Sequence, residues 1–264
     1  MQERGMKSMA NRLAGKVIVV TGGTKGIGAG IALMAASEGA RVVINGRNER
    51  DGERVVHNIQ EKYGTEALFI KGDISREPAC KQLIDETEAR FGRVDGLVNN
   101  AGIFPRGTMT DTPEEMFDSI FAVNIKGSFF CSMYAIQSML KTGGGSIVQI
   151  GSTNGYKGGK ELAAYSCSKG AMLTLNRHIA GHYGRDRIRS NWITVGWVAS
   201  EGEIELHQNR GLSPDELRKR AESYIPSGRM QTPEDIAHGT VFLLSEEASQ
   251  ITGTELHING GLGL

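Results

Sequence analysis

The stretch from residue 152 to residue 169 holds three side chains whose spacing suits proton transfer. Tyr165 and Lys169 are four residues apart, so on a helix they lie on one face, about one turn apart. A phenol with an ordinary pKa near ~10 is a weak acid–base group at neutral pH, and a nearby ammonium lowers that pKa. Ser152 adds a hydroxyl that can hold the substrate oxygen. The spacing predicts proton transfer at an alcohol or carbonyl oxygen, although Tyr-x-x-x-Lys alone is equally typical of a solvated helix face.

The elements that must position these residues follow a regular alternation. Apolar, mostly β-branched runs predict strands, and amphipathic patterns between them predict helices. The apolar runs do not alternate strictly with polar residues, as expected for strands covered on both faces. The alternation predicts an α/β fold with a parallel sheet and helices on both faces. The predicted strands are 16–20, 41–44, 67–71, 94–99, 146–150, 189–194 and 255–259, and the predicted helices are 26–38, 50–62, 77–91, 113–140, 163–183 and 232–244.

Three helix starts are marked by local sequence. Thr112-Pro113-Glu114-Glu115 and Ser213-Pro214-Asp215-Glu216 predict capping boxes with proline in the first turn, and Thr232-Pro233-Glu234-Asp235 is a close variant. The sequence shows no internal repeat or linker. We therefore expect one domain over 13–264, preceded by a flexible extension over 1–12.

Composition narrows the class of protein. The 264 residues include 30 Lys plus Arg and 30 Asp plus Glu, so nothing favours a nucleic acid or an anionic membrane as partner. No apolar run reaches the ~18 residues of a membrane span, and the N-terminus lacks the apolar core of a signal peptide. Three widely spaced cysteines, Cys80, Cys131 and Cys167, match neither a disulfide framework nor a zinc site. We expect a cytoplasmic protein that acts on a small molecule and binds no metal.

The first predicted strand runs directly into a glycine-rich turn, TGGTKGIG at 21–28. Glycines there let backbone N–H groups approach a pyrophosphate, which then faces the positive end of the following helix. The spacing is Gly-x-x-x-Gly-x-Gly, and no Gly-Lys-Ser/Thr follows, so it is not a P-loop. A strand, glycine loop and helix at this point predict a dinucleotide site.

The end of the second predicted strand bears on which dinucleotide is bound. A carboxylate at this point would bind the ribose 2′-hydroxyl of NAD, and an arginine would accept the 2′-phosphate of NADP. Gly46 stands where the carboxylate is expected, Arg47 follows it, and Lys25 lies in the glycine loop. Two cations and no carboxylate favour NADP over NAD.

With these residues in view, the chain from Leu13 to Leu264 resembles the short-chain dehydrogenase/reductases, in their short single-domain branch. The resemblance implies a Rossmann-like, doubly wound sheet of seven mostly parallel strands, a nicotinamide cofactor, and hydride transfer between a carbinol and a carbonyl. It rests on motifs in the family's order: TGGTKGIG at 21–28, Gly72-Asp73-Ile74, Asn99-Asn100-Ala101-Gly102, Asn124, Ser152, and Tyr165 with Lys169.

The resemblance also implies roles. Tyr165 would be the acid–base, Lys169 would lower its pKa and bond the nicotinamide ribose, Ser152 would polarise the substrate oxygen, and Asn124 would anchor a water linked to Lys169. The residues expected to bind the cofactor are Gly22, Thr24, Lys25, Gly26, Ile27, Gly28, Arg47, Asp73, Ile74, Asn100, Ala101, Gly102, Tyr165, Lys169, Val198 and Ser200. One departure stands out, because Val195-Gly196 replaces the family's usual Pro-Gly and frees a backbone N–H beside the nicotinamide.

The sequence indicates the substrate less clearly than the cofactor. A polar stretch over 197–225 is expected to cover the site as a lid. The candidate substrate residues are Ser152, Asn154, Tyr165, Trp197 and His207, with Trp197 interpreted as packing and His207 as a surface side chain.

Three functions stay open. The first is an NADP-dependent dehydrogenase or reductase of a sugar, polyol or other small carbonyl compound. The second is a 3-oxoacyl-(carrier protein) reductase, and the third is a non-catalytic dinucleotide sensor. Assembly into a homotetramer or homodimer, through the helices over 113–140 and 163–183 and the C-terminal segment, is implied by the resemblance.

Overall fold

The computed structural model describes residues 11–208, 211 and 213–263. Most of the extension expected over 1–12, namely residues 1–10, lies outside the described part of the chain. The same is true of residues 209, 210 and 212 in the expected lid and of Leu264 at the end of the expected domain. Arg12 is described, and its guanidinium bonds the buried carboxylate of Glu38 at 2.6 Å.

Within the described residues, seven strands form one sheet in the order β3-β2-β1-β4-β5-β6-β7, and every neighbouring pair is parallel. The expected fold class, a Rossmann-like doubly wound sheet of seven mostly parallel strands, is therefore confirmed. The order reverses between β1 and β4, and open parallel sheets bind ligands at the carboxyl edge of such a switch point. The strands are β1 Val17–Val20, β2 Arg41–Gly46, β3 Ala67–Lys71, β4 Gly96–Asn99, β5 Gly145–Ile150, β6 Ile188–Val195 and β7 Glu255–Ile258.

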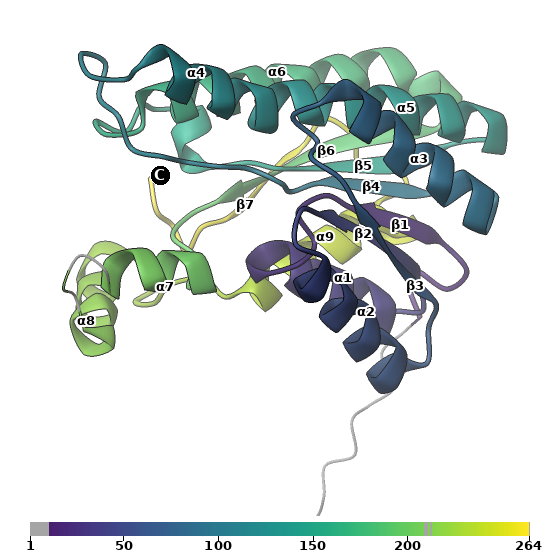
Figure 1. The fold of residues 1–264 in the computed structure, drawn as a ribbon, viewed down its shortest axis with the longest axis horizontal. Coiled ribbons are helices and arrows are strands. Elements are labelled where there is room, and N and C mark those ends of the chain that lie inside the picture. Colours follow the sequence, from purple (N-terminus) through teal and green to yellow (C-terminus); the bar gives the residue numbers. More distant parts are fainter. Residues whose placement is uncertain (1–10, 209–210, 212, 264) are drawn as a thin grey trace, which may run out of the picture.

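Helices cover both faces of the sheet (Figure 1). One group, α1, α2 and α9, lies on one face, and α3, α4, α5 and α6 lie on the other, while α7 and α8 stand apart at one end. The helices are α1 Gly26–Ser37, α2 Glu49–Tyr63, α3 Glu77–Phe91, α4 Glu114–Phe121, α5 Ser128–Thr142, α6 Ala163–Tyr183, α7 Glu201–Gln208, α8 Pro214–Tyr224 and α9 Pro233–Leu244.

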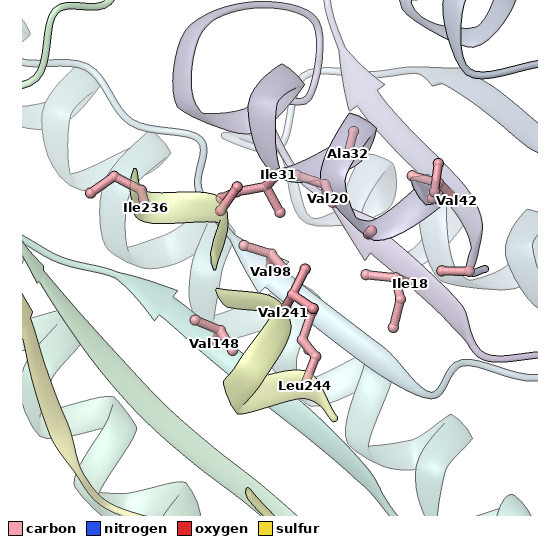
Figure 2. Packing of buried hydrophobic residues seen from close by; sticks show 14 of the residues in the cluster. Ile18, Val20, Ile31, Ala32, Val42, Val98, Val148, Ile236, Val241 and Leu244 are labelled. Carbon is pink, nitrogen blue, oxygen red and sulfur yellow. The ribbon is translucent and has the colours of Figure 1, made fainter. Parts of the chain in front are cut away.

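Among the described residues, the core consists of two large apolar layers, one on each face of the sheet, and a small third cluster around Trp192. In the first, side chains of β1 and β4 such as Ile18 and Val98 pack against Ile31 of α1 and Val241 of α9 (Figure 2). Burial of each such side chain contributes about 1.5–3 kcal/mol. Because both faces are buried, the strands show the nearly continuous apolar runs read from the sequence.

Two of the three predicted capping boxes form. Ser213 caps α8 and Thr232 caps α9, each with reciprocal bonds to the third helical residue. The box predicted at Thr112 is wrong, because α4 begins at Glu114 with Pro113 as a cap that makes no side-chain bond. The Thr112 hydroxyl instead donates to the carbonyl of Thr108 at 2.6 Å and closes the preceding turn.

The single helix predicted over 113–140 is interrupted. A π-helical segment, Ala122–Gly127, joins α4 to α5. By length and composition, the whole run Glu114–Thr142 is long and apolar enough to cross a membrane. The apolar runs in the sequence predict no such segment. However, 44% of its most apolar window is buried inside the fold, and core helices pass the same test. It packs against α3, α6 and β4.

Candidate active site

A groove of about 1520 Å³ runs along the carboxyl edge of the sheet. Its walls include the glycine loop, the ends of β2 and β4, the segment after β5, and the segment from β6 into α7. Every residue predicted from the sequence to bind cofactor or substrate lines this groove, as do Ser152, Tyr165 and Lys169. Asn124 is the exception, and it lies buried behind the groove.

The glycine loop is shaped as the dinucleotide prediction requires. Gly22 and Gly26 have φ angles of 62° and 55°, which side chains rarely adopt. A Cβ on Gly28 would stand 2.2 Å from the Gly22 carbonyl oxygen, so only glycine allows α1 to start this close to the loop. The cap residue Lys25 makes no side-chain bond to α1, and the first turn holds no acidic residue. The N-terminal N–H groups of α1 are therefore suited to hold a phosphate.

The loop after β4 is tied to the glycine loop. The Asn100 amide donates to the carbonyl oxygens of Thr21 and Gly22 at 2.9 and 3.1 Å. The Thr21 hydroxyl accepts from the backbone N–H groups of Asn100 and Ala101. These bonds fix two neighbouring loops that both line the groove, a role of Thr21 that the sequence motif did not reveal.

The end of β2 borders the groove at the corner where the sequence predicts the adenosine to bind. A Cβ on Gly46 would meet the Thr24 methyl at 2.5 Å, so an acidic side chain does not fit there without movement. Arg47 and Lys25 are both exposed at this corner. Burial raises the pKa of Asp73, but bonds from Ser75 and the charge of Arg47 outweigh it and lower the pKa overall. The corner thus combines two cations with a carboxylate that stays ionised.

The predicted catalytic side chains converge on one side of the groove. Tyr165 and Lys169 lie on α6, and the Lys169 ammonium is 5.8 Å from the centre of the Tyr165 ring. Lys169 is buried, and its ammonium donates to the carbonyl of Ile150 at 2.8 Å. The Ser152 hydroxyl accepts from the Asn154 backbone N–H at 3.1 Å, which leaves its proton free to point toward Tyr165.

The expected effect of Lys169 on Tyr165 is not what the structure shows. Desolvation of the phenol raises the pKa of Tyr165 to about 12, a bond with Ser152 opposes the rise, and the charge of Glu203 adds to it. Burial also lowers the pKa of Lys169 to about 8. The ammonium bonds a backbone carbonyl and not the phenol, so desolvation outweighs its attraction for the phenolate.

Asn124 lies in the π-helical segment, where its side chain bonds neighbouring protein groups. Its carbonyl oxygen accepts from Ile103 N at 2.8 Å, and its amide donates to Ile103 O and Ser168 Oγ at 3.0 Å each. Asn124 therefore joins the loop after β4 to α6. Because the groove does not reach it, the predicted water anchor stays a prediction.

The departure at Val195-Gly196 is accommodated at the end of β6. A Cβ on Gly196 would stand 2.7 Å from Gln231 Oε1 and 3.0 Å from the Asn259 Cα, so a larger residue would require the Gln231 side chain and the Asn259 backbone to shift. The segment that follows pairs with Gln231, whose N–H donates to Trp197 O and whose carbonyl accepts from Ala199 N. Val198 is therefore fixed against the loop before α9.

The structure corrects the interpretation of His207. It is not a surface side chain, because only 7% of it is exposed, and it lines the groove with Trp197. Both bond Glu203, which the sequence analysis did not single out as a site residue. The spacing of Glu203 and His207, four residues apart, was the available signal, but no helix over α7 was predicted. Phe104, whose ring lies 6.1 Å from Tyr165, was also missed.

Comparison with known proteins agrees with this geometry. A family model described as enoyl-(acyl carrier protein) reductase matches residues 22–263. An uncharacterized oxidoreductase of Thermotoga maritima is 41% identical over 247 residues, which cover 94% of this chain and 97% of that protein. The 2-(S)-hydroxypropyl-CoM dehydrogenase 3 of Xanthobacter autotrophicus is 37% identical over 254 residues, covering 96% and 99%.

A solved structure from Sinorhizobium meliloti 1021, assigned to the short-chain alcohol dehydrogenases, superposes with a TM-score of 0.88 at 30% identity. The match covers 96% of this chain and 98% of that one. The chain therefore belongs to the short-chain dehydrogenase/reductase family. It is an oxidoreductase of that family, and the family implies a nicotinamide dinucleotide as cofactor.

Proposed function

We propose that this protein transfers hydride between NADP and a secondary alcohol or ketone of a small molecule, in the cytoplasm. The observation that carries the proposal is that Ser152, Tyr165 and Lys169 line the same groove as the glycine loop, which is suited to hold a phosphate. Preference for NADP is supported by Arg47 and by Gly46, where the Thr24 methyl crowds the position of the carboxylate that NAD binding favours. A similarity to a dehydrogenase of a hydroxypropyl compound supports a secondary alcohol as substrate.

The chain's own residues supply binding and proton transfer. When bound, the nicotinamide would supply or accept the hydride. Tyr165, with a pKa of about 12, holds its proton at neutral pH and donates it to the substrate oxygen during reduction. The Ser152 hydroxyl donates a hydrogen bond to the same oxygen and holds it beside the phenol. The Lys169 charge, 5.8 Å from the ring centre, steadies the phenolate that remains.

Absorbance of the reduced nicotinamide tests the proposal directly. We expect turnover with NADPH and small ketones, sugars or polyols, at a higher kcat/KM than with NADH. An acetoacetyl thioester belongs in the same panel, because faster turnover of that compound would favour the acyl reductase. Tight dinucleotide binding without turnover of any carbonyl would instead favour the sensor.

Arg47→Ala tests the cofactor preference. Loss of a charge-assisted bond to the 2′-phosphate should raise the Kd for NADP about tenfold or more, because such bonds contribute about 1.5–3 kcal/mol. The Kd for NAD should stay within about twofold. Fluorescence titration of both cofactors gives the two values, and Arg50→Ala on the exposed start of α2 is the matched control. An equal loss for NADP and NAD would remove Arg47 from the 2′-phosphate site.

The pH dependence of reduction is expected to follow Lys169. Its charged form, present below the lowered pKa of about 8, steadies the phenolate left on Tyr165. The kcat/KM for ketone reduction should therefore be level below pH 8 and fall as pH rises through about 8, while Tyr165 stays protonated. A profile from pH 6 to 10, with thermal stability measured at each pH, checks this. A level profile to pH 10 would contradict it.

Assembly into a homotetramer or homodimer is part of the proposal. The aromatic side chains of Phe117 and Phe129, on α4 and α5, are 43% and 48% exposed, and subunit contacts commonly cover such apolar surface. Phe129→Asp should shift the protein toward smaller species in light scattering at micromolar concentration, because an unpaired charge in an interface is costly. Exposed Lys157→Asp is the control. An unchanged mass for Phe129→Asp would place the interface elsewhere.

A further inference from the structure

A cluster of polar and aromatic side chains lines the same groove as Tyr165. Its members are Trp197, which follows β6, and Glu203 and His207 on α7. One oxygen of Glu203, Oε1, accepts from Trp197 Nε1 at 2.9 Å and from His207 Nε2 at 3.0 Å. The Trp197 and His207 rings lie 5.5 Å apart. These contacts hold the imidazole in one orientation.

The second nitrogen of that imidazole has no bond. Among the described residues, His207 Nδ1 is buried and has no hydrogen-bond partner, although His207 lines the groove. A buried polar atom without a partner costs free energy, and it is kept most readily where a ligand completes the bond. The groove is the side from which such a ligand would arrive.

The bonds to Glu203 decide what His207 can recognise. An ionised carboxylate only accepts hydrogen bonds, so Nε2 carries the proton. In the neutral ring Nδ1 is then an acceptor, and it calls for a donor such as a hydroxyl. The Glu203 carboxylate beside it disfavours an anionic ligand group. Trp197, Glu203, His207 and Tyr165 all line the same groove, so a ligand in it is bordered by both the cluster and the phenol.

We propose that His207 Nδ1 accepts a hydrogen bond from a second hydroxyl group of the substrate. The substrates would then be diols, polyols or hydroxyketones, with one carbon reacting at Tyr165 and a neighbouring hydroxyl bound at His207. Glu203 positions the imidazole and fixes its tautomer, and Trp197 forms the apolar side of this subsite. This inference rests on the proposed function, because it names the substrate class of the same site.

Paired substrates test the subsite. The full-length protein with NADPH is assayed with 3-hydroxybutan-2-one and butan-2-one, and with their five-carbon homologues. The measured quantity is the ratio of kcat/KM for each hydroxyketone to that for its parent ketone. We expect this ratio to exceed one in the native protein. His207→Gln, which keeps a donor toward Glu203 but removes Nδ1, should lower the ratio about tenfold.

Two further variants separate recognition from a structural role. His207→Asn returns an acceptor near the Nδ1 position and should recover most of the ratio. Glu201→Gln makes a change on the exposed side of α7 and should leave the ratio within about twofold of the native value.

The remaining outcomes contradict either the subsite or the proposed function. A native ratio of one or less, a ratio unaltered by His207→Gln, or an Asn variant as poor as the Gln variant would overturn the subsite. Faster reduction of acetoacetate than of either ketone would also overturn it, because that anion would face Glu203. Turnover of no ketone with either cofactor would overturn the proposed function itself, and the subsite with it.

Discussion

Tyr165→Phe should lower kcat by about a thousandfold, within the range for loss of a positioned acid–base group. The variant removes only the phenolic hydroxyl, and the Phe104 ring 6.1 Å away still packs against the aromatic ring. The Kd for the dinucleotide should therefore stay within about twofold. Single-turnover measurements with saturating NADPH, together with fluorescence titration, separate the two effects.

The control for this variant is Tyr183→Phe, which makes the same change at the end of α6, away from the groove. It should keep native kcat. Retention of more than a tenth of native kcat by Tyr165→Phe would show that another group transfers the proton, and the assigned mechanism would fail.

Gly28→Ala should weaken dinucleotide binding at least a hundredfold. The added Cβ would stand 2.2 Å from the Gly22 carbonyl oxygen and 2.5 Å from the Asn100 amide nitrogen, both in the bonds that fix the loop. Relief of this overlap must move the backbone of α1 or of the glycine loop, at a cost of about 1–3 kcal/mol. We expect at least a hundredfold rise in Kd, about 2.7 kcal/mol, and a lower midpoint of thermal unfolding.

Gly181→Ala is the matched substitution, because no atom lies within 4 Å of its added Cβ on the exposed side of α6. It should raise stability by up to about 1 kcal/mol through helix propensity and leave cofactor binding unchanged. Native affinity in Gly28→Ala would mean that the dinucleotide does not use this loop.

Much of the fold could be predicted because its signals are local. A strand buried on both faces shows a continuous apolar run, as in β1. Ser213 and Thr232 mark the starts of their helices, because each stands in a capping-box motif. The Thr112 box failed because its hydroxyl had a competing acceptor four residues earlier, the carbonyl of Thr108. The π-helical segment left no sequence signal that we recognised.

In the candidate site too, some features could be predicted from local sequence and others could not. Glycines and the Tyr–Lys pair are constrained by close backbone approach and helix spacing, so their positions could be read from sequence. The orientation of the His207 ring depends on its contacts with Glu203 and Trp197. Its burial depends on how the segment over 197–208 folds back on the groove. The pKa of Tyr165 depends on desolvation, which spacing does not reveal.

Under the proposed preference for NADP, the contact between Gly46 and Thr24 bears on how the cofactor preference could change. Introducing a carboxylate at position 46 alone would drive a Cβ to 2.5 Å from the Thr24 methyl, which lies in the glycine loop itself. Either the Thr24 side chain has to shift, or a residue smaller than threonine at position 24 has to accompany the change. The two positions are therefore energetically coupled, and a carboxylate at position 46 is better tolerated once the residue at position 24 is smaller.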